Sequence, residues 1–141
     1  MAGLRTIRCI EGNMDDTQHI KILCIEDEFF ISELYTRALR TAGYEVVVIS
    51  DGDLALAEAE KDLYDIILLD IMIPGMSGIE ILRRLRGSNR TTTLKAKIII
   101  TTNLDQEEEG RASIEEKADG YLIKAEITPR ELVAYLKQLQ L

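Results

Sequence analysis

Acidic, hydroxyl and ammonium side chains follow four separate apolar runs in this 141-residue sequence. They are Glu26, Asp27 and Glu28 after the first run, Asp70 after the third, Thr101 and Thr102 after the fourth, and Lys124 after the fifth. Carboxylates that gather in one place repel one another, so their clustering indicates a bound cation. Oxygen-rich sites of this kind suit Mg²⁺, which also bridges to phosphate oxygens. The residue types therefore indicate phosphoryl chemistry with magnesium.

Asp70 is the residue we expect to react, because it is central and follows four consecutive aliphatic residues. A carboxylate can attack phosphorus and form an acyl phosphate. Such a transfer needs mainly positioning and charge neutralisation, which Lys124 and magnesium would supply, while Thr102 would supply a hydrogen bond. Taken singly, Asp27 could cap a helix and Lys124 could be an ordinary surface residue. Four such features at four strand ends are much harder to explain that way.

Five short apolar or β-branched runs alternate with segments of helical spacing. The predicted strands are 20–25, 45–49, 65–69, 97–101 and 120–123. This alternation predicts an α/β fold with a parallel sheet covered by helices on both faces. Right-handed crossovers leave few topologies, and we expect the flavodoxin-like (βα)5 doubly wound sheet with strand order 2-1-3-4-5. Ligands of such sheets bind at the carboxyl ends of the strands.

Helix boundaries have their own signals. Ser77 with Glu80, and Thr128 with Glu131, have the spacing of a capping box, in which two side chains satisfy backbone donors at the start of a helix. Gly43 follows the first predicted helix and suits its carboxyl-terminal cap.

Composition limits the classes of function. The formal net charge is -8 and no basic block is present, which argues against direct nucleic-acid binding. No apolar run approaches the roughly 20 residues of a membrane helix, and residues 1–19 carry no signal peptide, so we expect a cytoplasmic protein with no membrane association. We expect residues 1–19 to be an irregular leader and residues 20–141 to form a single domain.

The same residues resemble the receiver domain of two-component response regulators, the CheY-like family. The resemblance covers about residues 20–141. It rests on four segments, which are the opening strand with its acids (22–28), the acceptor loop with its proline and glycine (68–78), the strand that ends in threonine (98–103) and the strand that ends in lysine (120–124).

The resemblance implies a role for each matching residue. Asp70 would be the phosphoacceptor. The magnesium ligands would be Glu26, Asp27, Asp70 and the backbone carbonyl of Met72. The phosphoryl-binding and switch residues would be Thr102, Lys124 and Tyr121, with Thr102 favoured over Thr101 by its spacing to the lysine. One departure is Ala125, which stands where the family usually has a proline in a cis peptide. A cis bond before a residue other than proline costs about 2.5–4 kcal/mol. The sequence therefore leaves open whether the Lys124 side chain reaches Asp70.

We therefore expect a stand-alone receiver that is a switch rather than an enzyme. A sensor histidine kinase or a histidine phosphotransfer protein would donate the phosphoryl group, and a downstream protein would read the changed surface. The family also allows a homodimer through the helices that follow the fourth and fifth strands. One alternative is a receiver segment of a longer regulator. Another is a phosphatase with an aspartyl nucleophile, although Met72 stands where its general acid would be. A flavin-binding module or an unphosphorylated adaptor would leave the acids, threonine and lysine unexplained.

Overall fold

A five-stranded parallel sheet forms the centre of the protein, with strand order β2-β1-β3-β4-β5. The computed structural model describes residues 20–87, 94–103, 108–139 and 141. The strands are β1 (Lys21–Ile25), β2 (Glu45–Ile49), β3 (Ile66–Asp70), β4 (Lys97–Thr102) and β5 (Gly120–Ile123). The predicted fold and strand order are confirmed, and the predicted strand bounds differ by at most one residue at each end.

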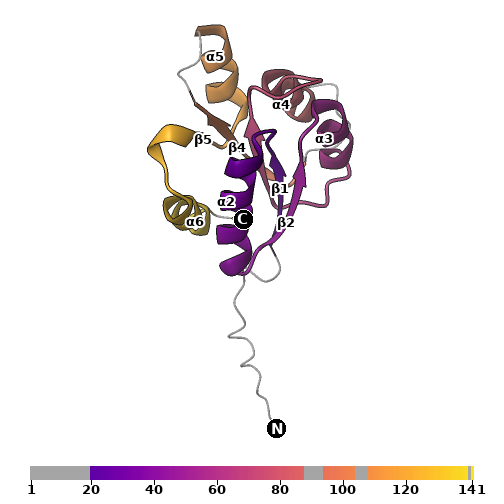
Figure 1. Cartoon of the computed structure of the whole chain (residues 1–141). Helices are drawn as coiled ribbons and strands as arrows, with labels where there is room; N and C mark the ends of the chain where they lie inside the picture. The colour runs from indigo at the N-terminus through magenta and orange to yellow at the C-terminus, as the bar shows by residue number, and fades with distance from the viewer. Residues whose placement is uncertain (1–19, 88–93, 104–107, 140) are drawn as a thin grey trace.

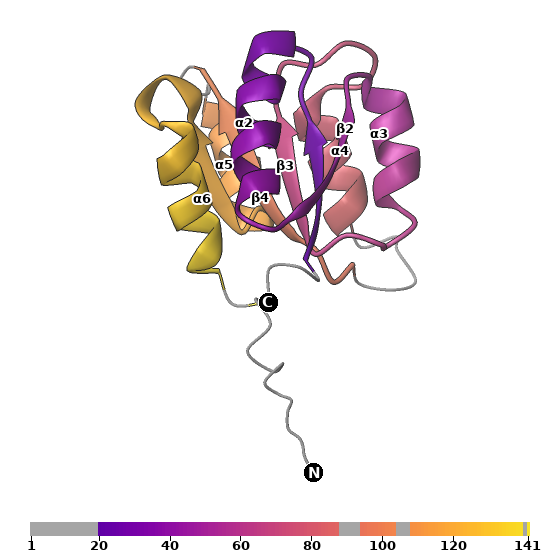
Figure 2. The same cartoon turned by 60° about the horizontal axis from the view of Figure 1, so that its bottom comes forward.

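Helices cover both faces of the sheet, as Figures 1 and 2 show. They are α2 (Phe29–Thr41), α3 (Gly52–Ala59), α4 (Gly78–Arg86), α5 (Glu108–Lys117) and α6 (Pro129–Lys137). Helices α2 and α6 pack together on one face, whereas α3, α4 and α5 lie on the other. The leader expected over residues 1–19 lies outside the described residues.

The helix boundaries follow from the local sequence. At α6, the Thr128 hydroxyl accepts from Glu131 N and the Glu131 carboxylate accepts from Thr128 N, which confirms that capping box. At α4, the Ser77 hydroxyl accepts from Glu80 N at 3.2 Å, but the Glu80 carboxylate pairs with Arg84. Only the serine half of that predicted box is therefore observed. Gly43 has φ 105°, the left-handed conformation that a glycine adopts without steric cost.

The strands alternate between two apolar layers because successive side chains point to opposite faces. In β3, Leu69 belongs to the layer under α3, α4 and α5, and Leu68 belongs to the layer under α2 and α6. Both side chains are at most 1% exposed. Asp70 ends this strand, so the rigid centre of the sheet fixes its position. No helix among the described residues is long and apolar enough to cross a membrane.

Replacing Leu68 with alanine tests this account of the core. The side chain is 1% exposed, so the substitution leaves a cavity beneath α2 and should lower the free energy of unfolding by about 2–5 kcal/mol. Leu54→Ala is the matched control, since Leu54 is 65% exposed and its loss should cost less than about 0.5 kcal/mol. Urea unfolding followed by circular dichroism measures both. Equal losses would contradict the assignment of Leu68 to the core.

Candidate functional site

Three carboxylates meet at the carboxyl ends of β1 and β3. These strands are parallel neighbours, with Ile25 beside Leu69, so the acids that follow them come together. One oxygen each from Glu26, Asp27 and Asp70 lies within 4.8 Å of the others. We name these three residues the acidic cluster. Glu26 and Asp70 are each only 2% exposed, whereas Asp27 lies at the surface. Oxygen donors at this spacing fit a hard divalent cation.

The ammonium group of Lys124 neutralises part of this charge. Lys124 Nζ donates to Glu26 Oε1 at 2.7 Å and to Asp70 Oδ2 at 3.1 Å. It also donates to Glu28 Oε1 at 3.2 Å. The Lys124 residue is 7% exposed, so these contacts form where water screens charges poorly. The last strand thus delivers a cation to the acids of the first and third strands.

Burial and hydrogen bonding shift two pKa values here. Burial raises the pKa of Glu26 to about 7, although the hydrogen bonds from Lys124 and from Glu28 N pull it back. Burial alone would lower the pKa of Lys124, but the hydrogen bond to Glu26 and the charge of Asp70 outweigh it and raise that pKa above its usual value. Lys124 therefore stays protonated, and it is a counter-charge rather than a base.

The loop after Asp70 is fixed by backbone contacts. Met72 N donates to Asp70 Oδ1 at 3.1 Å, so both oxygens of Asp70 have a donor. Gly52 N donates to Pro74 O at 2.8 Å, which ties the loop to the start of α3. A Cβ at Gly52 would collide with the backbone of Met76, and a Cβ at Gly78 would collide with the Asp70 carbonyl. Both glycines therefore permit close approach around the acid.

The lysine loop reaches Asp70 without a cis peptide. No cis bond occurs among the described residues, so Lys124–Ala125 is trans. Lys124 opens a short 3-10 turn that ends at Glu126. Lys124 can therefore contact Asp70 although Ala125 replaces the usual proline, since Nζ lies 3.1 Å from Asp70 Oδ2.

Thr102 and Tyr121 lie on the same face of the sheet. Ile100 of β4 is beside Tyr121 of β5, and Thr102 is two residues beyond Ile100, so alternation places all three on one side. Thr101 pairs with Leu122 and belongs to the opposite face. The register therefore favours Thr102 as the partner of Tyr121.

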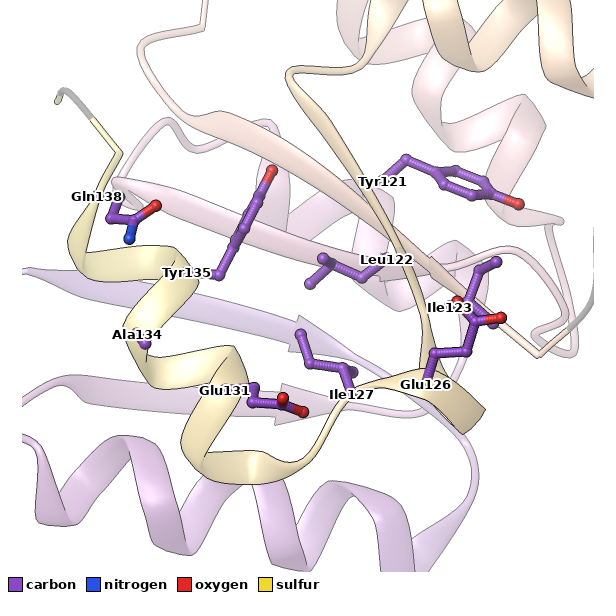
Figure 3. A pocket seen from close by; sticks show the side chains of 9 residues that line it. All are labelled: Tyr121, Leu122, Ile123, Glu126, Ile127, Glu131, Ala134, Tyr135 and Gln138. Carbon is purple, nitrogen blue, oxygen red and sulfur yellow. The ribbon is translucent and has the colours of Figure 1, made fainter.

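Tyr121 and its neighbour Leu122 point to opposite sides of β5. Figure 3 shows its ring on one side of that strand, whereas Leu122 and Tyr135 point into the space between β5 and α6. That space is a groove of about 510 Å³, which the ends of Glu126 and Glu131 also line. Tyr121 is half-buried and packs against the apolar layer under α5.

Sequence reasoning did not assign a role to Glu28. It is the residue that precedes α2, yet its side chain makes no capping hydrogen bond and contacts Lys124 instead. The available signal was a third consecutive acid at the end of β1. Only the position of Lys124 shows which acids it meets.

The model of the response regulator receiver domain matches residues 22–137. An open parallel sheet with acids at β1 and β3 and a lysine at β5 is what that match leads one to expect. The chain belongs to the receiver domains of two-component response regulators.

Relatives and solved structures agree with this assignment. Alkaline phosphatase synthesis transcriptional regulatory protein PhoP of Bacillus subtilis is 37% identical over 119 residues, which are 84% of this chain and 48% of PhoP. Sensory transduction protein RegX3 of Mycolicibacterium smegmatis is 36% identical over 82% of this chain and 48% of its own length. The chain spans about half the length of the curated relatives it matches.

Two solved receiver structures show the same fold. The BeF3-activated receiver domain of Klebsiella pneumoniae RstA has a TM-score of 0.70 and 32% identity, with 83% of this chain and 95% of that one covered. Chemotaxis protein CheY4 of Vibrio cholerae has a TM-score of 0.71 and 29% identity, with 86% and 98% covered.

Removing the Lys124 ammonium should destabilise the protein strongly. Lys124→Met leaves two buried carboxylates without their cation, and breaking a buried ion pair costs about 3–5 kcal/mol. Lys137→Met, on the exposed end of α6, is the matched control and should change little. Urea unfolding with chelator present gives the comparison. Unchanged stability of Lys124→Met would show that the ion pairs at this site contribute nothing to folding.

Proposed function

We propose that Asp70 accepts a phosphoryl group from a phosphohistidine and that the protein is a switch rather than a turnover enzyme. The observation that carries this is the buried Asp70 carboxylate with Lys124 Nζ 3.1 Å from one of its oxygens. An Asp70 oxygen would attack phosphorus while the P–N bond breaks, and the donor imidazole would leave with the electron pair. The Lys124 ammonium would offset charge on the transferred group.

Magnesium fits the acidic cluster. Glu26, Asp27 and Asp70 offer oxygen donors within 4.8 Å of one another, and the carbonyl of Met72 would add a fourth. Magnesium would lower the repulsion between the acidic cluster and the incoming phosphoryl oxygens. Because Lys124 Nζ also bonds two of these acids, the cluster is already partly neutralised when the cation arrives.

Thr102 and Tyr121 are the proposed switch residues. Thr102 would donate its hydroxyl proton to the new phosphoryl oxygens and move toward Asp70. Since Tyr121 lies on the same face of the sheet, that movement would open space for its ring. The result would be a changed surface around α5 and β5, which a downstream protein would bind.

The proposed partners of this chain are those that receiver domains have in two-component systems. A sensor histidine kinase or a histidine phosphotransfer protein would supply the phosphoryl group in the cytoplasm, and a homodimer remains part of the proposal. DNA-binding response regulator MtrA of Mycobacterium bovis is 34% identical, and the matched region covers 51% of that protein. The absence of direct nucleic-acid binding by this chain and its action as a stand-alone receiver both stay predictions. The alternative is a receiver segment of a longer regulator.

The phosphatase alternative is weaker on one specific point. Its general acid would stand two residues after the nucleophile, where this chain has Met72. A thioether cannot transfer a proton, and the Met72 residue is 75% exposed. Sustained turnover of a phosphomonoester would favour the phosphatase over the switch.

Phosphorylation of the purified protein tests the proposal. With acetyl phosphate and magnesium, the wild type should gain one phosphate that hydroxylamine removes, and chelation of magnesium should prevent labelling. Asp70→Asn should abolish it, because an amide cannot form the acyl phosphate. Asp62→Asn is the matched control and should label normally, since asparagine tolerates the φ of 57° found there. Labelling of Asp70→Asn at the wild-type level would exclude Asp70 as the acceptor.

Thr102→Val should separate phosphorylation from the switch. Valine has the shape of threonine but no hydroxyl, so phosphate should still reach Asp70 while the Tyr121 resonances stay at their unphosphorylated positions. Thr101→Val, on the opposite face, should leave the shift of Tyr121 intact. Nuclear magnetic resonance with labelled tyrosine measures both. A normal Tyr121 shift in Thr102→Val would remove Thr102 from the switch.

A further inference from the structure

Glu28 is an acid that the proposed transfer does not use, yet it contacts the central lysine. Its Oε1 lies 3.2 Å from Lys124 Nζ, and its side chain is 48% exposed, against 2% for Lys124 and Glu26. Glu28 N donates to Glu26 Oε2 at 3.0 Å, which holds the two acids side by side. The geometry therefore gives Lys124 three carboxylate partners, of which Glu28 is the most accessible.

We propose that Glu28 is a positioning residue that retains Lys124 among the carboxylates and thereby limits phosphorylation of Asp70. This inference rests on the proposed function. An incoming phosphoryl group needs the Lys124 ammonium, and Glu28 competes with it for the same protons. Its contact with the ammonium, 3.2 Å long, therefore favours the unphosphorylated state.

The fold supports a role beyond capping. Glu28 has the extended backbone of a residue that precedes a helix, with φ −84° and ψ 109°. Its side chain makes no capping bond to α2, so the carboxylate has no role at the start of that helix. The contact with Lys124, 96 residues further along the chain, takes the carboxylate instead.

Removal of the carboxylate should accelerate phosphorylation. Glu28→Gln keeps the shape of the side chain and weakens the hold on Lys124. Labelling of Asp70 by acetyl phosphate at saturating magnesium should become about two- to five-fold faster, the range for loss of one half-exposed ion pair. Glu33→Gln, exposed on the helix α2 that follows Glu28, makes the same change in net charge and should label at the wild-type rate. Glu28→Asp keeps the charge but shortens the reach, and should approach the rate of Glu28→Gln.

The affinity for beryllofluoride is a second measurement, and it should not change if Glu28 has only a structural role. Beryllofluoride imitates the phosphoryl group without a covalent bond, and fluorine resonance reports its binding. Glu28→Gln should bind beryllofluoride about two- to five-fold more tightly at saturating magnesium. Magnesium alone should bind no more tightly than to the wild type, because Glu28 is outside the acidic cluster.

The outcomes separate this inference from the proposed function. If the wild type takes no phosphate on Asp70, the proposed function fails. If the wild type is labelled but Glu28→Gln is labelled at the same rate or more slowly, only the role of Glu28 is overturned. Two further results would show that the faster labelling reflects net charge and not the contact with Lys124. They are equal acceleration in Glu33→Gln and a wild-type rate in Glu28→Asp, and either one would overturn the proposed role of Glu28.

Discussion

The ammonium group of Lys124 lies within 3.2 Å of three carboxylates, and the carboxyl edge of the sheet depends on this contact. Two of these acids are almost fully buried, where an unpaired charge is very costly. Lys124 follows β5, Glu26 follows β1 and Asp70 ends β3, so the site exists only when these three strands are assembled in the sheet. The Lys124 ammonium therefore contributes both to the stability of the fold and to the charge of the candidate site.

This arrangement explains how the two carboxylates can be buried. The proposed magnesium ion and phosphoryl group would each change the local charge at this site. The hydrogen bond to Glu26 and the charge of Asp70 hold the pKa of Lys124 above its usual value even against burial. Lys124 therefore provides a positive charge between two buried carboxylates.

Most of the fold followed from sequence patterns, for identifiable reasons. The runs before Asp70 and Thr102 are short and continuously aliphatic, which is typical of strands buried on both faces, and a parallel sheet brings the ends of such strands together. Glu28 was missed because its partner is 96 residues away, and no local pattern encodes such a contact. Glu80 was expected to complete a capping box, but Arg84 competes for its carboxylate on the helix surface. The site roles predicted for Asp70, Thr102 and Tyr121 stay predictions.

The loop between Asp70 and α4 has a consequence for how such a protein can diversify. Its path is set by main-chain bonds, by the close approach at Gly52 and Gly78, and by the buried side chains of Ile71 and Ile73. Met72 and Pro74 project outward from that path and are exposed. The outward side chains can therefore change during evolution while the Asp70 carboxylate beneath them keeps its position.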